Sequence, residues 1–501
     1  MSFVNKLIIS LLASAAVAVA TWSEGGYGNG VVRWTSIFAG FMLILLIFSL
    51  LYGRLRTGKN VRQVVLTNLK PWVPAGIFAI IVAASLANVT HERILISELV
   101  NPHGGEEVLL ISDGLRAKDS APAYLPGTLS RALTSRQLQL HLSILTIGFV
   151  LWMLLTRRVA LCILTLLVIN GLILAIAGIY YHFNDNGLLL GRYESVNPRY
   201  FSAFRYHAHW SAFSLLTFTA GIGLAAFPGL TKGWRIAVLA LVVASWGVFF
   251  YAATLAQSRS LVLLLIGVIV LAVVQLFRAF VIHRGTDPRA KRLLAPVACL
   301  LILGVGGAVF AGQKILEARA GDTTSMLRAW KDGHPPMRLL IARDSLKLVA
   351  AKPLWGWGLG CYRFAFTGVA GPEFREDERQ HQTAFYGRLI TTQFAHNDWL
   401  QYWSEIGTPA MFCLIATPWL LLRKSRRSGR RNATSYWCFG GCALILVHAL
   451  WDFPLSNPAI LLLTTVVFIV GAKLQFALGK ETPITESGIT SSRSGSSAEV
   501  K

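Results

Sequence analysis

Several charged side chains lie beside long apolar stretches of this 501-residue sequence. A charge at membrane depth costs roughly a few kcal/mol, so such a residue usually has a partner or a task. Arg259 lies in the short connection Ala256–Ser260 between two apolar stretches. Its planar guanidinium could hold an anion through two parallel hydrogen bonds. Alternatively, it could anchor a helix end by extending its charged group into water.

Two more arginines, Arg338 and Arg343, lie in a segment whose apolar residues have helical spacing. This spacing predicts an amphipathic helix lying on the bilayer or on a helix bundle. Its arginines could bind an anion or simply meet lipid headgroups. The apolar residues are Leu339, Ala342, Leu346 and Val349.

A glycine-spaced turn follows from Lys352 to Gly360. Such a turn can let backbone N–H groups approach an anion closely, but its spacing does not fit a dinucleotide motif. Next, His396 lies in the segment Phe394–Glu405, which leads back to an apolar stretch. A histidine can exchange a proton near neutral pH, so His396 could be a general base. A structural role is the alternative.

Asp452 follows His448 at the end of a later apolar stretch. Its carboxylate could cap the next turn or pair with an arginine. The six cysteines show no spacing typical of a metal site and are expected to be small core residues. The cysteines therefore indicate no metal site.

The composition indicates the kind of fold that positions these residues. Of all residues, 54% are hydrophobic and 14% are charged, whereas soluble domains have about 25% charged residues. The mean hydropathy is +0.55. The net charge of +23 comes mainly from short clusters between apolar stretches, which weighs against nucleic-acid binding and favours a membrane topology.

Apolar stretches of about 20 residues predict an all-α polytopic integral membrane protein with about twelve transmembrane helices. The first could be a cleaved signal peptide, but we favour an uncleaved helix. Because basic clusters recur in alternate connections, both termini are predicted to be cytoplasmic. The predicted helix centres are Ala13, Leu43, Ile80, Gly148, Ile169, Phe218, Ala244, Val268, Leu303, Ile415, Ile445 and Val466.

This topology predicts one helical domain, residues 1–480, and a disordered cytoplasmic tail, residues 481–501. The connections on the other side are then periplasmic. The longest, residues 316–405 between helices 9 and 10, contains Arg338 and His396. The connection from Thr90 to Arg136 is expected to be a solvated cap.

Taken together, these segments resemble the O-antigen ligase and polymerase superfamily of bacterial membrane glycosyltransferases. The resemblance extends from about Tyr193 to the twelfth helix and depends on the order of weak motifs: Ser258-Arg259, Arg338 before the glycine turn, His396-Asn397-Asp398-Trp399-Leu400 with Glu405-Ile406-Gly407, and Asp452-Phe453-Pro454-Leu455. It implies transfer of a glycan from undecaprenyl diphosphate to lipid A core or another glycan, at the periplasmic face of the bacterial inner membrane. The resemblance implies no metal, no cofactor and no nucleotide sugar.

The resemblance also implies roles for individual residues. His396 would be the general base and Arg259 and Arg338 would hold the diphosphate, in a displacement that inverts the anomeric configuration. The expected substrate-binding residues are Arg205, Arg343, Asn397, Glu405 and Asp452. The Phe201–Trp210 segment departs from the family pattern, which weakens the assignment of Arg205.

Two other functions remain open at this point. A polymerase of the same family would use the same kind of donor but lengthen a glycan. A polysaccharide-lipid flippase could also have twelve helices with both termini inside. We favour a ligase-like transferase over the flippase because the polar residues gather on one side, whereas transporters have polar sites near the midplane. The sequence does not identify the sugar, the linkage, the acceptor or the oligomeric state.

Overall fold

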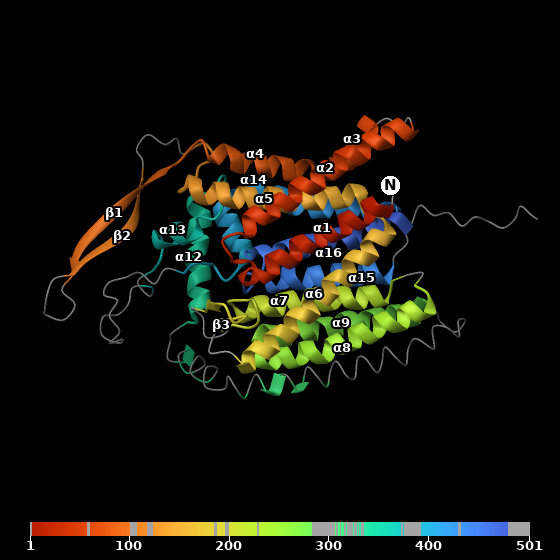
Figure 1. Cartoon of the computed structure of the whole chain (residues 1–501). Coiled ribbons are helices and arrows are strands. Elements are labelled where there is room, and N and C mark those ends of the chain that lie inside the picture. The colour runs from red at the N-terminus through yellow and green to blue at the C-terminus, as the bar shows by residue number, and fades with distance from the viewer. Residues whose placement is uncertain are drawn as a thin grey trace, which may run out of the picture.

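The computed structural model describes residues 3–57, 61–100, 108–117, 124–184, 188–195, 200–227, 230–282, isolated residues between 306 and 331, 335–371 with 374, 392–428 and 432–478. Most of these residues are helical. The longer helices lie roughly side by side in Figure 1. Their bounds are α1 Phe3–Trp22, α2 Val31–Thr57, α3 Val61–Leu69, α4 Val73–Ser85, α5 Arg131–Leu154, α6 Arg157–Asn184, α7 His207–Ala225, α8 Lys232–Ala256, α9 Arg259–Ile282, α14 Asp398–Ser428, α15 Ala433–His448 and α16 Pro458–Leu478.

Length and composition identify the spanning helices. Eight helical segments of the described chain are long and apolar enough to cross a membrane. Eleven of the twelve predicted centres lie in described helices, whereas Leu303 lies outside the described residues. The fold is therefore that of a polytopic helical membrane protein, and the total of twelve spans stays a prediction. The tail 481–501 also lies outside the described residues.

The prediction of an all-α fold was wrong in one respect. Strand β1 (His91–Val100) pairs antiparallel with β2 (Val108–Ala117), and His91 lies opposite Ala117. This hairpin occupies part of the connection that we expected to be a solvated cap, and it projects from one end of the bundle in Figure 1. A smaller hairpin joins β3 (Leu188–Leu189) to β4 (Tyr193–Glu194).

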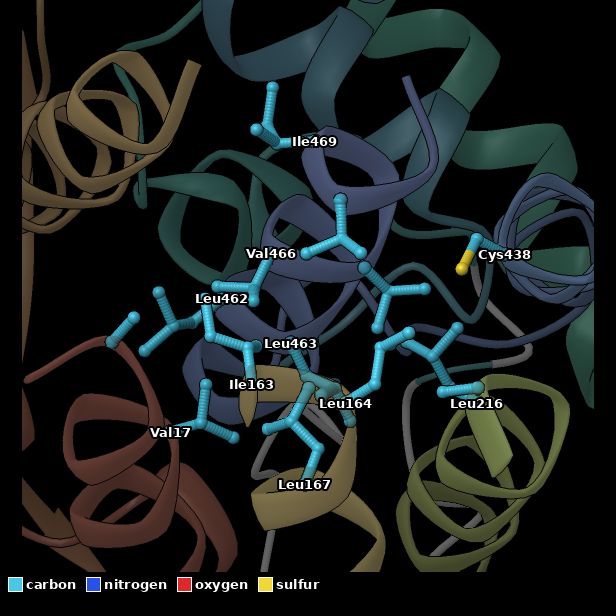
Figure 2. Close-up of a cluster of buried hydrophobic side chains, with 14 of the residues drawn as sticks. Val17, Ile163, Leu164, Leu167, Leu216, Cys438, Leu462, Leu463, Val466 and Ile469 are labelled. Atoms are coloured by element: carbon cyan, nitrogen blue, oxygen red, sulfur yellow. The ribbon is translucent and has the colours of Figure 1, made fainter. Parts of the chain in front are cut away.

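The centre of the bundle is a continuous apolar core. Side chains from α1, α6, α7, α15 and α16 meet there (Figure 2). Small residues let the helices approach closely. A Cβ atom built on Gly441 of α15 would lie 2.1 Å from the Thr219 hydroxyl of α7. Packing of small residues is a common basis of helix association where no water is present.

The two ends of the bundle differ in character. At one end, the Asn457 amide before α16 donates to the Gly25 carbonyl, which follows α1. At the other end, Lys424 near the end of α14 donates to the Thr67 carbonyl of α3. The basic clusters around Arg157 and Lys424 therefore lie at the end opposite to Asn457. We call the Asn457 end the polar end, because the site described below lies there.

Two shorter helices, α12 (Met337–Ala351) and α13 (Tyr362–Thr367), cover the polar end. Helix α12 runs across the ends of the bundle helices in Figure 1. The predicted amphipathic helix is confirmed, but the predicted apolar face was largely wrong. Leu339 and Leu346 are exposed, and the buried face contains Leu340, Ile341 and Leu348 instead. The helical spacing of apolar residues is compatible with more than one buried face of α12. The contacts of α12 with α13 and α14 determine which face is buried.

Candidate active site

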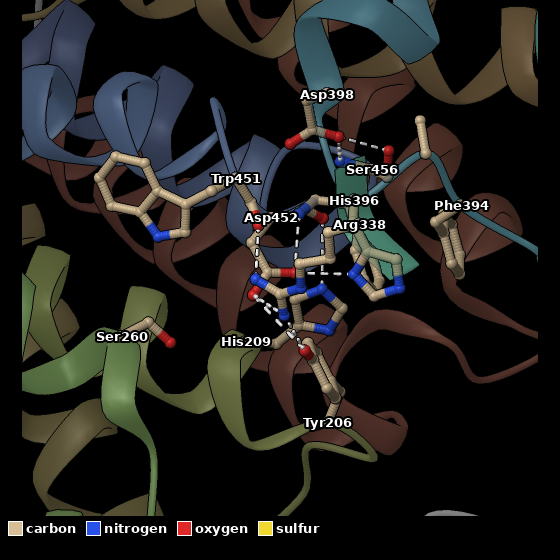
Figure 3. Close-up of polar contacts among 12 residues, drawn as sticks. Tyr206, His209, Ser260, Arg338, Phe394, His396, Asp398, Trp451, Asp452 and Ser456 are labelled. Atoms are coloured by element: carbon tan, nitrogen blue, oxygen red, sulfur yellow. Dashed lines mark hydrogen bonds and ion pairs between the residues drawn. The ribbon is translucent and has the colours of Figure 1, made fainter. Parts of the chain in front are cut away.

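The Asp452 carboxylate is the centre of an ionic cluster at the polar end (Figure 3). Asp452 is 2% exposed and lies in the connection between α15 and α16. Its Oδ1 atom is 3.7 Å from His396 Nδ1. Its Oδ2 atom is 3.7 Å from His448 Nε2 and 3.7 Å from an Arg338 amino group. One carboxylate is thus surrounded by a cation and two groups that can carry a proton.

Arg338 is fixed by the first turn of α12 and by three partners. Its guanidinium donates to the Trp451 carbonyl at 2.7 Å and to the Tyr206 hydroxyl at 3.3 Å, besides facing Asp452. The side chain remains 49% exposed. Because a guanidinium has five N–H donors, Arg338 keeps donors for a ligand while the protein holds it in place.

His396 has a backbone conformation that favours glycine, with φ of +50°. This left-handed conformation costs about 1 kcal/mol or more for an ordinary residue. The neighbouring Ala395 N–H donates to Gln401, and the Asn397 side chain accepts from the Leu400 N–H at the start of α14. Strain of this kind, held by the surrounding contacts, is typical of functional positions.

Aromatic rings support the histidine from one side. Phe453 stacks on Phe394 with ring centroids 4.3 Å apart and also stacks on Tyr206. The His396 ring meets Phe453 edge-on at 4.9 Å. Figure 3 shows Arg338, Asp452 and Tyr206 on the other side of the His396 ring from Phe394.

Asp398 holds the connection that carries Asp452. The two oxygens of Asp398 accept from the N–H groups of Leu455 and Ser456 at 2.6 and 3.0 Å. The Asp398 N–H in turn donates to the Asp452 carbonyl at 3.2 Å. Since Asp398 follows His396 by two residues, these bonds fix His396 and Asp452 relative to each other.

The environment of Asp452 keeps it negatively charged. Burial alone would raise the pKa of this carboxyl, but contacts with His396 and His448 and the charge of Arg338 outweigh burial. They hold the pKa of Asp452 well below its usual range. A permanent negative charge therefore faces His396 Nδ1 at 3.7 Å.

Arg259, the third predicted catalytic residue, begins α9. This helix packs antiparallel to α15, because Leu271 meets Gly440 and Gly267 meets Leu444. Continuing that register brings Ser260 opposite Trp451, and Figure 3 shows Ser260 and Trp451 on the same side of the ionic cluster, away from Phe394. Arg259 therefore lies at the polar end, near the cluster but on its far side from His396.

Two predicted binding arginines have carboxylate partners of their own. Arg205 forms an ion pair with Glu24 beside the cluster. Arg343 forms two bonds to Asp344, at 2.9 and 3.2 Å. Burial would raise the pKa of Asp344, but hydrogen bonds from Arg343, Lys347 and the Gly371 N–H lower it to about 2. Neither arginine contacts Asp452 through a described ion pair.

Glu405 and Asn397 have structural partners in the described chain. The Glu405 carboxylate accepts the N–H groups of Gly360 and Tyr362 at 2.8 and 3.2 Å. The Glu405 carbonyl accepts the Gly358 N–H at 2.8 Å. The glycine turn therefore does surround an anion closely, but that anion is a side chain of the protein. Asn397 donates to the Leu450 carbonyl and so ties α14 to the end of α15.

Glycine is required in this turn for two reasons. Gly356 has a φ of +67°, and a Cβ atom there would lie 2.4 Å from the Glu405 carbonyl oxygen. Gly407 has a φ of +73°, and its Cβ would lie 2.1 Å from the Leu354 oxygen. The turn is thus shaped to dock on α14.

Three residues of the cluster were absent from the predicted site. Tyr206 donates to Asp452 at 3.5 Å, and His209 contacts the Phe453 carbonyl at 3.2 Å. His448 is wholly buried. Its spacing of four residues from Asp452 is a signal in the sequence, whereas Tyr206 and His209 reach the site only through the fold. In the described part of the chain, no group of three or more His, Cys, Asp or Glu side chains is arranged to hold a metal.

These features define a polytopic membrane protein with an ionic site at one end of its helices. Residues 244–415 match the family model described as O-antigen ligase, and this match supports the resemblance to the O-antigen ligase and polymerase superfamily. The match covers Arg259, Arg338 and His396 but ends before Asp452. Members of the family are glycosyltransferase-like enzymes, so the match supports a ligase- or polymerase-type function in polysaccharide biosynthesis. No curated protein matches the chain.

Proposed function

We propose that this protein is an O-antigen ligase-like glycosyltransferase. It moves a glycan from undecaprenyl diphosphate to lipid A core or a related acceptor, at the periplasmic face of the inner membrane. The observation that carries the proposal is the position of Asp452 between His396 and Arg338, each 3.7 Å away. A base and a cation beside one buried carboxylate are the groups that this transfer requires.

His396 is the general base in this proposal. Its Nδ1 atom faces Asp452, so Nε2 is the nitrogen that takes the proton from the acceptor hydroxyl. The acceptor oxygen attacks the anomeric carbon, and the bond from that carbon to the diphosphate oxygen breaks. Attack opposite the leaving group inverts the anomeric configuration. The separation of 3.7 Å is slightly longer than a hydrogen bond, and such contacts commonly tighten when substrate binds.

Arg338 stabilises the leaving group. The electron pair of the broken bond stays on the diphosphate, whose growing negative charge is met by the exposed donors of the guanidinium. Arg259 approaches the diphosphate from α9. Asp452 stabilises the imidazolium that forms on His396 and does not itself take the proton. Neither step requires a metal or another cofactor.

The positions of the other residues refine the predicted site. Arg205 can contribute to donor binding only by sharing or leaving Glu24. We propose positioning roles for Asn397 and Glu405, because their side chains hold α15 and the glycine turn. Asp452 acts on the two catalytic side chains more than on the substrate.

Product analysis tests the function. Purified protein is incubated with a glycan on undecaprenyl diphosphate and either lipid A core or a second donor molecule. Glycan on lipid A core is the expected product, and a lengthened donor would instead identify a polymerase. Movement of the lipid without a new glycosidic bond would contradict both and favour a flippase. His396→Ala should abolish transfer, whereas the exposed histidine of α6 provides a matched control, His182→Ala.

A further inference from the structure

A long apolar slot lies between α4, α5, α14, α15 and α16. It has a volume of about 270 Å³, and its walls are almost entirely apolar. On α14 its lining residues lie on both sides of the break in the helix at Gly407, and on α16 they run from Leu461 to Ile469. Four of its five walls are helices long and apolar enough to cross a membrane, so the slot lies within the membrane-spanning part of the bundle.

The wall has few polar groups, and the largest set of them, around His141 and Tyr402, is hydrogen-bonded within the protein. His141 Nε2 lies 3.3 Å from the Tyr402 hydroxyl, which also donates to the Leu455 carbonyl at 3.2 Å. The other ring nitrogen of His141 lies 2.7 Å from the Gln137 carbonyl. These contacts leave hydrocarbon facing the slot. A water molecule would find few hydrogen-bond partners in such an apolar space. Close-packed protein interiors seldom contain an empty cavity of this size.

One end of the slot adjoins the ionic cluster. Asp398 and Leu455 line it there, and the same two residues bond to each other in the connection that carries Asp452. A ligand in the slot would therefore have its polar end near the connection that carries Asp452, whose carboxylate faces Arg338 at 3.7 Å. An anionic headgroup would extend past this connection to the exposed donors of the Arg338 guanidinium.

The slot also has a lateral exit toward the bilayer. Ile415 of α14 and Leu446 of α15 both line it and are both exposed at the outer surface of the bundle. Trp399 bridges these helices by donating to the Leu446 carbonyl at 3.1 Å. A chain could enter between α14 and α15 without passing through the polar end.

We propose that this slot binds the polyprenyl chain of the lipid-linked diphosphate, with its first isoprene units next to Asp398 and the remainder leaving between α14 and α15. The proposal rests on the proposed function for the identity of the lipid. A volume of about 270 Å³ with almost entirely apolar walls suits part of one hydrocarbon chain and offers few partners for the hydroxyl groups of a sugar. A second cavity of about 470 Å³, between α2 and α5, shares no lining residue with this slot and contains none of the cluster residues.

Photocrosslinking tests the occupant without requiring transfer. A benzophenone amino acid replaces Ile415, which lines the slot, or Phe412, an exposed residue of the same helix that does not. Labelled undecaprenyl diphosphate, carrying no sugar, should crosslink several-fold more at position 415. Excess unlabelled undecaprenyl diphosphate should compete, and phosphatidylglycerol at the same concentration should not. Equal labelling at both positions, or equal competition by phosphatidylglycerol, would overturn the proposal.

Chain-length dependence tests the slot during transfer. Leu446→Trp narrows the slot, and Val447→Trp places the same ring on the adjacent exposed residue outside it. Leu446→Trp should raise KM about tenfold for a long-chain donor and leave KM unchanged for a ten-carbon prenyl donor. Val447→Trp should change neither value. An equal effect of Leu446→Trp on both donors would contradict a chain-binding slot, whereas absence of transfer with every donor would refute the proposed function and leave the crosslinking result standing.

Discussion

Two buried carboxylates at the polar end have opposite surroundings. Glu405 accepts short hydrogen bonds from the backbone N–H groups of Gly360 and Tyr362, which can neither move far nor lose a proton. Asp452 also accepts one backbone N–H, that of Phe453 at 3.0 Å, but its carboxylate faces the side chains of His396, His448 and Arg338 at 3.7 Å. Both carboxyl groups are buried, yet Asp452 is the one that lies next to a guanidinium and two imidazoles.

The partners of the two carboxyl groups distinguish a structural role for Glu405 from a place in the candidate site for Asp452. Backbone N–H groups of Gly360 and Tyr362, together with the Gln401 amide at 3.5 Å, donate to Glu405 and hold the glycine turn on α14. The partners of Asp452 reach the solvent through Arg338 and His396, which are partly exposed. Burial of a charge therefore does not identify a functional site by itself, and the nature of its partners is more informative.

The largest effect is expected for Asp452→Asn. An amide cannot supply the negative charge that favours a proton on His396, so glycan transfer should fall by about 10²- to 10⁴-fold. The rate is measured in detergent or vesicles with saturating acceptor. The thermal midpoint serves as the control for folding. Transfer within threefold of the unchanged protein would place Asp452 among structural carboxylates such as Glu405.

A smaller effect distinguishes the two arginines of α12. Arg338→Ala should lower the transfer rate by about 10²- to 10³-fold, because a donor to the growing charge is lost. Arg343→Ala is the matched control on the same helix, and it should lower the rate less than threefold because Arg343 is paired with Asp344. Arg338→Lys should be intermediate, since lysine lacks the planar fork. Equal losses for both alanine variants would contradict this division.

Glu405→Gln should lower the stability of the fold and leave the transfer rate per folded molecule nearly unchanged. The glutamine amide would put donors against the N–H groups of Gly360 and Tyr362, which costs about 1 to 3 kcal/mol. We expect a lower thermal midpoint and faster proteolysis near the glycine turn. Transfer per folded molecule should stay within a few-fold of normal. A large fall in the transfer rate with an unchanged thermal midpoint would instead indicate that Glu405 acts in substrate binding.

The smallest effect concerns Asp344, whose pKa is lowered to about 2. A lowered carboxyl pKa stabilises the folded state above the unfolded pKa of about 3.9, and this stability is lost as pH falls toward 2. Because Arg343 and Lys347 are about half exposed, we expect on the order of 1 kcal/mol. Thermal midpoints of Asp344→Asn and the unchanged protein should differ at pH 6 and converge near pH 2. A constant difference would show that Asp344 acts through packing instead.

The helices were largely predictable because the sequence pattern follows directly from the hydrocarbon layer. Predicted centres such as Ala13 and Val466 lie in described helices because about 20 apolar residues have few alternatives to a helix in a membrane. The β1–β2 hairpin was missed, although the turn-forming segment Asn101–Gly105 separates its two strands. Outside the hydrocarbon layer, the length and hydrophobicity of a segment do not determine its secondary structure in this way.

The site was predictable only in part. His396, Arg338 and Asp452 were identified from the sequence, and the fold brings them together. Tyr206 belongs to the same cluster through contacts across more than 100 residues, which no local pattern indicates. The glycine turn was expected to approach an anion, but the identity of that anion depends on the docking of α14.

The bonds between Asp398 and the Leu455–Ser456 backbone also bear on the order of biogenesis. Tyr206, Arg338 and His396 leave the ribosome before Asp452 does. Their shared carboxylate is clamped in place only when the segment before α16 reaches Asp398. A nascent chain that stops short of that segment has His396 and Arg338 but lacks the clamped carboxylate that both of them face. The ionic cluster is therefore completed only when the segment that precedes α16 is in place.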